Sequence, residues 1–153
     1  MKSSKSKATA WLLLAAVIAV VAFIWFNSLE PPELSSEKSG RVTAWLTPIL
    51  ELVVGEGNVT EHLVRKMAHF SEFFLLGIVL TSLISGRIKS LWTALITCLF
   101  CTLLIAMIDE TIQLFTDRGS QLKDVWLDFA GGSAGVALVL LVRSLSGGNT
   151  RRK

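Results

Sequence analysis

The sequence predicts an all-α integral membrane protein, a four-helix bundle with an amphipathic helix on its outer surface. Of the 153 residues, 52% are apolar and 18% are charged, against about 25% charged in soluble domains. Four segments of 18 or more residues carry almost no charge, and each approaches the roughly 20 residues that an α-helix needs to cross a bilayer. These segments are Ala8–Phe26, Met67–Ile84, Leu91–Ile108 and Val125–Val142. A soluble domain, a disordered chain and a disulfide-framed secreted chain are therefore excluded.

The distribution of charge predicts how the chain is oriented. All twelve acidic residues lie within 29–72 or 109–128, whereas nine of the fifteen basic residues lie near the two termini or in the 85–90 connection. Four crossings place these basic segments on one side, and the positive-inside rule makes that side cytoplasmic. We therefore predict a multi-pass plasma-membrane protein with cytoplasmic termini. The basic pI of about 9.1 then reflects topology and contact with the lipid bilayer, and we expect no nucleic-acid partner.

The first predicted span covers 8–26. Its apolar stretch is longer than the 7–15 residues typical of a signal peptide, and no small-x-small cleavage site follows, so we expect an uncleaved helix. It ends before Pro31-Pro32, because a continuing helix would lose backbone donors there. The stretch from Glu30 to Gly40 is polar and is predicted to be a loop.

Apolar residues recur at helical spacing between Val42 and Val54, which predicts an amphipathic helix on the outer surface. Pro48 opens the alternative that this helix begins there with Thr47 as its cap. Three further spans are predicted at 63–84, 91–114 and 124–145, followed by a flexible tail at 146–153. The whole chain, 1–153, is expected to form a single domain.

Ionisable residues inside a membrane cost about 2.5–3.5 kcal/mol each at the centre of a helix. In this chain ionisable residues, together with the polar Gln113, gather at the outer ends of three spans. The residues are Arg65, His69 and Glu72 on one face of the second span, Asp109, Glu110 and Gln113 at the end of the third, and Asp124 and Asp128 at the start of the fourth. At 1.5 Å per residue, all lie within roughly 10 Å of the outer interface. This pattern favours a one-sided pocket over a conduit.

A stripe of small residues predicts which way the fourth span faces. Asp124, Asp128, Gly131 and Gly135 advance by four, three and four positions, so they share one helix face. A Gly-x-x-x-Gly pattern is typical of close helix packing in membranes. We therefore expect Gly131 and Gly135 to pack against a neighbouring helix and the two aspartates to point into the bundle.

Structural alternatives remain open for several of these groups. Asp124 on its own is also explained as a helix N-cap, and Asp109 with Glu110 as a solvated helix end. His69 and Glu72, three residues apart, are also explained as an ion pair. Cys98 and Cys101, in mid-span among apolar residues, are interpreted as small apolar side chains.

At these positions the chain resembles the VanZ-like family of small membrane proteins. The resemblance covers about 64–139. The matching residues are Arg65-Lys66-Met67-Ala68-His69-Phe70-Ser71-Glu72, Leu76-Gly77, Asp109-Glu110-x-x-Gln113, Arg118, Asp124, Asp128, Gly131 and Gly135. Two positions depart from the family pattern: Phe73 stands where the family often has Tyr, and Asp128 stands where many members have Asn. The first argues against an essential phenol, and the second makes this site more acidic.

The family takes its name from a member associated with resistance to the glycopeptide antibiotic teicoplanin. The resemblance implies a role at the cell envelope, on lipid-linked or wall precursors or on a glycopeptide. It does not imply a particular reaction, and it does not imply resistance in this protein.

The first functional hypothesis is an enzyme that hydrolyses or transfers a group on an anionic or lipid-linked envelope substrate. Its catalytic candidates are His69, Glu72, Glu110 and Asp128, with His69 as general acid or base and Glu72 orienting it. Its substrate-binding candidates are Arg65, Lys66, Gln113, Arg118 and Asp124, since Arg binds phosphate or carboxylate bidentately. A divalent metal is possible, with His69, Glu72, Glu110 and Asp128 as candidate ligands. No pattern for a covalent nucleophile is recognisable.

The second hypothesis is a non-catalytic protein that binds envelope components with the same residues. The third is a small proton-coupled transporter, which four helices per chain would support only as an oligomer. The lack of ionisable residues in the inner half counts against transport, and we favour the enzyme slightly. The oligomeric state stays open.

Overall fold

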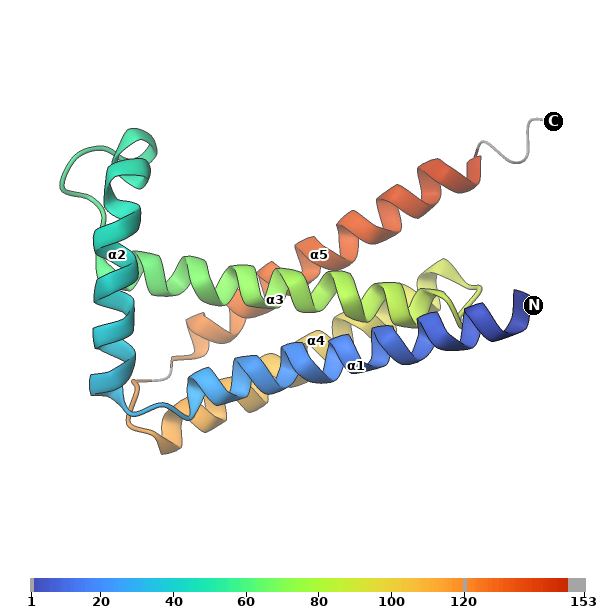
Figure 1. Cartoon of the computed structure of the whole chain (residues 1–153), viewed down its shortest axis with the longest axis horizontal. Coiled ribbons are helices and arrows are strands. Elements are labelled where there is room, and N and C mark those ends of the chain that lie inside the picture. The colour runs from blue at the N-terminus through green and yellow to red at the C-terminus, as the bar shows by residue number, and fades with distance from the viewer. Residues whose placement is uncertain (1, 120, 149–153) are drawn as a thin grey trace.

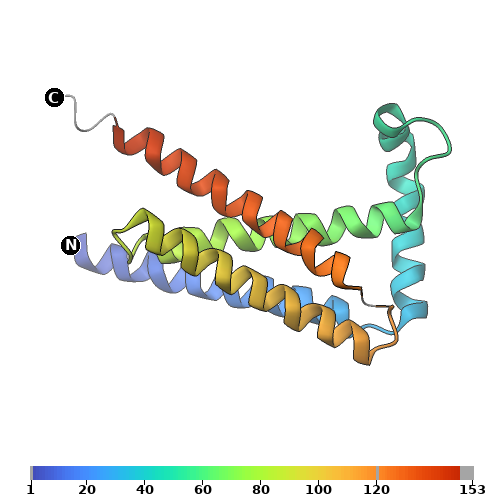
Figure 2. The ribbon, with the colours of Figure 1, turned by 180° about the vertical axis from the view of Figure 1, so that it is seen from behind.

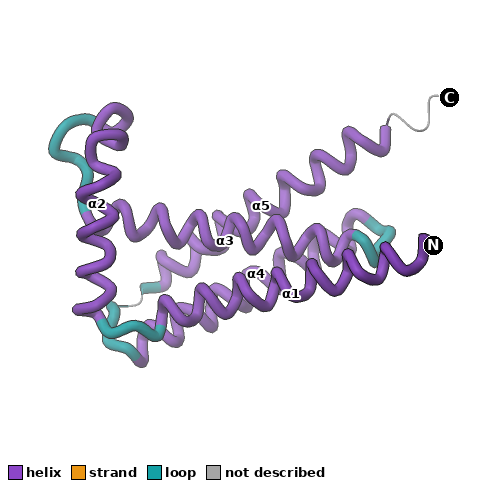
Figure 3. Tube along the Cα trace, viewed as in Figure 1, coloured by secondary structure: helices purple, strands orange, loops and turns teal. Residues whose placement is uncertain are grey.

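The computed structural model describes residues 2–119 and 121–148, which form five α-helices. These are α1 (Lys2–Ser28), α2 (Pro32–Val54), α3 (Glu61–Ser85), α4 (Leu91–Phe115) and α5 (Leu122–Gly148). The described residues contain no strand (Figure 3). Four of the helices, all except α2, are long and apolar enough to span a membrane. The predicted all-α membrane bundle is confirmed.

The bundle is organised around α3, which packs against each of the other four helices. In both ribbon views α1 and α4 run side by side, and α5 crosses α3 obliquely before its C-terminal half diverges from the bundle (Figures 1 and 2). Helix α2 lies across one end of the bundle (Figure 1). The start of α1, the end of α5 and the α3–α4 connection all lie at the opposite end.

Two of the spanning helices begin at side-chain caps, which explains why they start close to their predicted positions. The Thr60 hydroxyl accepts a hydrogen bond from the Leu63 N–H at the start of α3 (3.1 Å). The Ser90 hydroxyl does the same for the Thr93 N–H at the start of α4 (3.3 Å). Ser and Thr are favoured at this position because they satisfy a backbone donor that the helix itself leaves free.

The predicted loop from Glu30 to Gly40 is wrong, because α2 begins at Pro32. Proline suits the first turn of a helix, since its missing N–H has no partner there and its φ is already helical. The alternative start at Pro48 with Thr47 as cap is wrong too. Pro48 lies inside α2, and the Thr47 hydroxyl donates back to the Thr43 carbonyl oxygen (2.7 Å).

The last helix is longer than predicted. Helix α5 continues through Gly148, so the prediction of a flexible tail is wrong for 146–148. The rest of that predicted tail, 149–153, lies outside the described residues.

Helix α2 presents an apolar face that the bundle does not cover. Trp45, Ile49, Leu52 and Val53 are all exposed. A helix that lies across the end of a membrane bundle with exposed apolar side chains is suited to the boundary between headgroups and acyl chains. This matches the predicted amphipathic surface helix.

Helices α3 and α5 approach so closely that their backbones are in contact. A Cβ atom added to Gly131 would overlap the carbonyl oxygen of Phe70, and one added to Gly135 would overlap that of Phe74. From the other side, a Cβ on Gly77 would overlap the carbonyl oxygen of Gly132. Small residues permit this approach, which supplies the dispersion contacts that hold membrane helices together.

We predict that Gly135→Ala destabilises the protein by about 1–3 kcal/mol, because the new methyl group has no room against α3. The matched control is Gly40→Ala, since Gly40 also lies in a helix but has no atom within 4 Å of its added Cβ. Thermal unfolding of the two variants in detergent should give a lower midpoint for Gly135→Ala. Equal midpoints would contradict the backbone contact.

Candidate functional site

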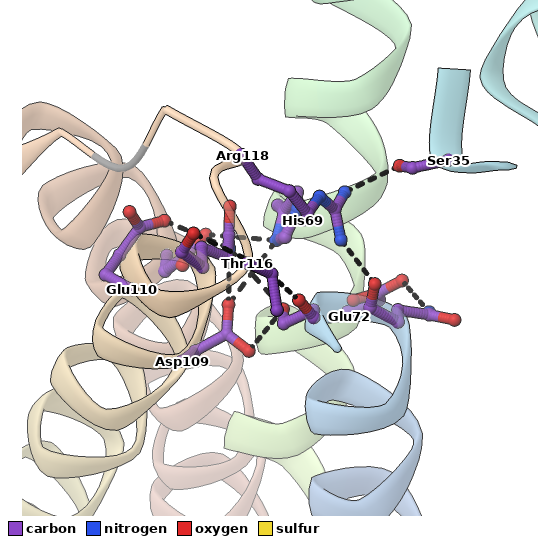
Figure 4. Close-up of polar contacts among 11 residues, drawn as sticks. Ser35, His69, Glu72, Asp109, Glu110, Thr116 and Arg118 are labelled. Carbon is purple, nitrogen blue, oxygen red and sulfur yellow. Dashed lines mark hydrogen bonds and ion pairs between the residues drawn. The ribbon is translucent and has the colours of Figure 1, made fainter. Parts of the chain in front are cut away.

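A polar cluster lies at the α2 end of the bundle, where α1 and α4 end and α3 and α5 begin (Figure 4). Asp109 and Asp128 are 0% and 1% exposed, and Glu110 is also buried. An apolar layer that includes Ile24 and Phe73 packs in the adjoining core. The predicted convergence of polar residues from three spans is thus present, and its members are withdrawn from solvent.

His69 stands at the centre of the cluster and faces two carboxylates. Its Nδ1 atom is 3.9 Å from Oδ2 of Asp109 and 3.9 Å from Oδ1 of Asp128. One donor atom from each of the three residues lies within 4.8 Å of the other two. The residues come from α3, α4 and α5, so the packing of three helices fixes their spacing.

Asp109 is oriented by two hydrogen-bond donors. The Ser28 hydroxyl, at the end of α1, donates to Oδ1 (2.7 Å), and the Gln113 amide donates to Oδ2 (2.8 Å). Gln113 Nε2 also lies 3.2 Å from Oε1 of Glu110. Because these donors are buried, they hold the carboxylate in one position.

Glu72 lies beside this group and is held from α1. The Asn27 amide donates to Glu72 Oε1 (3.0 Å), while Oε2 has no hydrogen-bond partner among the described residues. His69 and Glu72 are not joined by an ion pair, since both ion pairs of His69 are to aspartates. The alternative of a His69–Glu72 ion pair is therefore wrong.

A sharp turn after α4 brings Arg118 back over the cluster. The backbone is left-handed at Asp117 (φ 55°) and at Gly119 (φ 72°), and the Arg118 guanidinium donates to the Asn27 carbonyl oxygen and to the Ser35 hydroxyl (2.7 Å to the latter). Burial, and after it the charge of Arg65, lowers the pKa of Arg118, although an arginine stays protonated in proteins. A fixed positive charge thus links α1, α2 and the cluster.

Two cavities flank His69, and three residues, Arg65, His69 and Arg118, line both. The first has a volume of about 200 Å³, lies towards α2 and is also lined by Glu72 and Ser35. The second has a volume of about 240 Å³, lies towards α5 and includes the residues Lys66, Glu110, Gln113, Asp124 and Asp128 in its lining. Either is large enough for a small headgroup and smaller than the 300–1,000 Å³ of drug-sized pockets.

The remaining predicted residues lie around the second cavity in ion pairs. Arg65 contacts Glu61 (2.7 Å), and Lys66 contacts Asp124 (3.1 Å). The alternative that Asp124 is a helix N-cap is wrong, because α5 begins at Leu122, and its ion pair with Lys66 joins α5 to α3. The alternative that Asp109 and Glu110 form a solvated helix end is wrong, since both are buried.

Sequence reasoning missed three contributors from the N-terminal part of the chain, Asn27, Ser28 and Ser35. The signal for the first two was present, since a polar pair ends an otherwise apolar span, but their direction depends on how α1 packs. The central place of Asp109 was also missed. Asp109 lies four residues before Gln113, which put both on one helix face. The sequence analysis nevertheless named its neighbour Glu110, and not Asp109, as a catalytic and metal-binding candidate.

We predict that Ser28→Ala destabilises the protein by about 1–3 kcal/mol, because buried Asp109 loses the hydrogen-bond donor to its Oδ1. Ser71→Ala is the control, since the exposed Ser71 hydroxyl donates to the Met67 carbonyl oxygen of its own helix and has no other hydrogen bond to the residues that the structure describes. The thermal midpoints of both variants in detergent test this. If Ser28→Ala unfolds no earlier than Ser71→Ala, Ser28 does not hold Asp109.

No curated protein and no solved structure matches the chain. The model of the VanZ/LLP1 family matches residues 13–143, a range that begins in α1, ends in α5 and includes every residue of the buried cluster as well as the α3–α5 glycine contact. Because this match spans most of the described helices, the chain belongs to the VanZ/LLP1 family.

Proposed function

We propose that the protein acts at the outer face of the cytoplasmic membrane, where its pocket binds the anionic headgroup of a lipid-linked envelope component. The observation that carries this proposal is the position of Arg118. Its guanidinium is half-buried between two cavities that both reach His69, at one end of a membrane bundle.

Charge placement supports an outward-facing pocket. The basic residues Lys7, Arg87, Lys89 and Arg143 lie at the end of the bundle opposite α2, as do the start of α1 and the end of α5 (Figure 1). Basic segments are retained on the cytoplasmic side during insertion. The α2 end, with the pocket and all the acidic residues, would then face outwards.

The lining of the cavities supports an anionic ligand. Arg65 and Arg118 border both cavities, and Lys66 borders the larger one. Guanidinium groups bind phosphate with two parallel hydrogen bonds, which adds direction as well as strength. A headgroup held at this depth leaves its hydrocarbon tail beside the exposed apolar surfaces of the spanning helices, so a lipid-linked ligand fits better than a soluble one.

The surroundings of His69 support proton exchange without a covalent step. Among the described residues, no hydroxyl or thiol group is hydrogen-bonded to His69. Its imidazole faces two carboxylates and both cavities, so it is placed to exchange a proton with a bound headgroup. The buried ionisable residues of the described chain, Asp109, Glu110 and Asp128, all lie at the α2 end, which supports a pocket over a transport path.

We predict that the purified full-length protein in detergent binds a polyprenyl phosphate at least about tenfold more tightly than the matching polyprenol. A hydrogen bond to a charged group contributes about 1.5–3 kcal/mol, and 1.4 kcal/mol corresponds to a factor of ten. Arg118→Gln should remove most of this preference. Arg41→Gln should retain it, because Arg41 is exposed on α2 and its one ion pair within the described part of the chain is with Glu37.

Arg65→Gln provides a second variant in case Arg118→Gln disturbs folding, since Arg65 lines both cavities and, among the described residues, its guanidinium bonds only to Glu61 of the same helix. Equal affinity for the phosphate and the alcohol would overturn the proposal, as would full retention of the preference in both pocket variants.

In cells, His69→Ala, Glu72→Ala and Asp128→Ala should remove any change in envelope phenotype, including teicoplanin susceptibility, that the wild-type chain confers at equal abundance.

The orientation yields a separate prediction. In a background of Cys98→Ala and Cys101→Ala, a cysteine introduced by Glu56→Cys should react with a membrane-impermeant maleimide on intact cells. One introduced by Lys89→Cys should react only after permeabilisation. Both positions are exposed and lie at opposite ends of α3. The reverse pattern would place the pocket on the cytoplasmic side.

A further inference from the structure

The carboxylates beside His69 lack a cation among the described residues. No Lys or Arg nitrogen of the described chain lies within 4.0 Å of Asp109 or Asp128, and His69 is their only ionic neighbour. Arg65 and Lys66, which line the same cavity, are engaged by Glu61 and Asp124. Two carboxylates in a low-dielectric interior repel one another and are costly to bury unless something compensates their charge.

We propose that His69, Asp109 and Asp128 form a binding site for one divalent transition-metal ion. The three donor atoms come from three different helices and lie within 4.8 Å of one another. Metal–ligand distances of about 2.0–2.2 Å are reached from this arrangement by side-chain rotation, because the His69–aspartate separations are 3.9 Å.

A second observation points to a ligand at the same place. Oδ2 of Asp128 has no hydrogen-bond partner among the described residues, although Asp128 is only 1% exposed. Nδ1 of His69, the atom that faces both aspartates, also lacks a hydrogen-bond partner there. Buried polar atoms are nearly always satisfied, and an ion bound between His69 and Asp128, whose other oxygen Oδ1 faces the imidazole, would satisfy both atoms.

The neighbours of these residues are arranged as around a metal site. Ser28 and Gln113 donate to opposite oxygens of Asp109 and fix its orientation. Hydrogen bonds of this kind hold ligating carboxylates in position and tune their affinity. The group of donor atoms that lie within 4.8 Å of one another contains Asp109 in addition to His69 and Asp128, so Asp109 takes the place of Glu72 and Glu110, the other carboxylates predicted as ligands.

The donor set indicates which ions fit. One imidazole nitrogen and two carboxylates suit Zn²⁺ or Mn²⁺, whereas Mg²⁺ and Ca²⁺ prefer oxygen alone. His69 and Asp128 line the cavity of about 240 Å³, so positions left open on the ion would face it. An ion there would act as a Lewis acid towards a phosphate oxygen. The inference shares its residues with the proposed headgroup site and explains how an anion is tolerated beside carboxylates.

The test uses the full-length protein in detergent, stripped with chelator and free of added lipid. Co²⁺ is titrated and followed by its visible absorption, and Zn²⁺ is then added in competition. We expect one ion per chain. Asp128→Asn and His69→Gln should each weaken Co²⁺ binding by at least about tenfold, the loss typical even of residues that only support a ligand.

Two control variants sharpen the result. Glu56→Gln removes an exposed carboxylate of the α2–α3 connection that is not in the lining of either cavity, and this variant should bind Co²⁺ as the wild type does. Glu37→Gln removes an exposed carboxylate on α2, paired with Arg41, and should also keep one ion per chain. Size-exclusion profiles and helical content establish that each variant is folded. For the wild type, a rise in thermal midpoint with Zn²⁺ that chelator reverses gives a readout independent of any variant.

The inference is overturned if the folded wild type binds no ion above the level of Asp128→Asn, which would mean that shared protons neutralise the carboxylates. It is also overturned if Asp128→Asn and His69→Gln bind Co²⁺ normally. Because no lipid is present, these outcomes are separate from the polyprenyl phosphate measurement. A metal-free protein that prefers the phosphate lipid would retain the headgroup proposal alone.

Discussion

The close contact between α3 and α5 sets the geometry on which the rest of the structure depends. Gly131 and Gly135 lie directly against the carbonyl oxygens of Phe70 and Phe74. Phe70 follows His69 in the chain, and Gly131 lies one helical turn beyond Asp128 on α5. The contact that two glycines permit therefore fixes the distance between the imidazole and the carboxylate. In a membrane, where apolar surface alone does not drive helices together, such packing is the main source of cohesion.

Once that distance is fixed, the buried polar groups must be satisfied from within the protein. Helix α1 does this from its last turn, where Asn27 and Ser28 donate to Glu72 and Asp109. The turn after α4 contributes Arg118, whose guanidinium donates hydrogen bonds to the Asn27 carbonyl oxygen of α1 and to the Ser35 hydroxyl of α2. The cluster thereby joins all five helices at one end of the bundle, and the opposite end has no comparable buried ionisable group among the described residues.

The fold and much of the cluster were predictable from the sequence, because span length, hydropathy and the positions of charge are local properties. The convergence of His69, Gln113 and Asp128 followed from helical spacing and antiparallel order. The choice between Asp109 and Glu110 did not, because adjacent residues differ by only a small rotation of the helix that neighbouring side chains decide. The start of α2 was also missed. Two prolines followed by a polar stretch are typical of a loop, but they are equally compatible with a helix whose first residue is proline. The contacts that α1 makes with the cluster join residues 45 or more positions apart and therefore have no local signature.

Helix α2 has a consequence that reaches beyond its own contacts. The exposed apolar side chains of Trp45, Leu52 and Val53 suit α2 to the boundary between water and lipid. Its Ser35 hydroxyl accepts a hydrogen bond from Arg118. The spanning helices are of fixed length, so a thinner or thicker bilayer shifts that level relative to α3. A change in membrane thickness, although it involves no direct contact with the pocket, would therefore move the Arg118 guanidinium relative to the pocket.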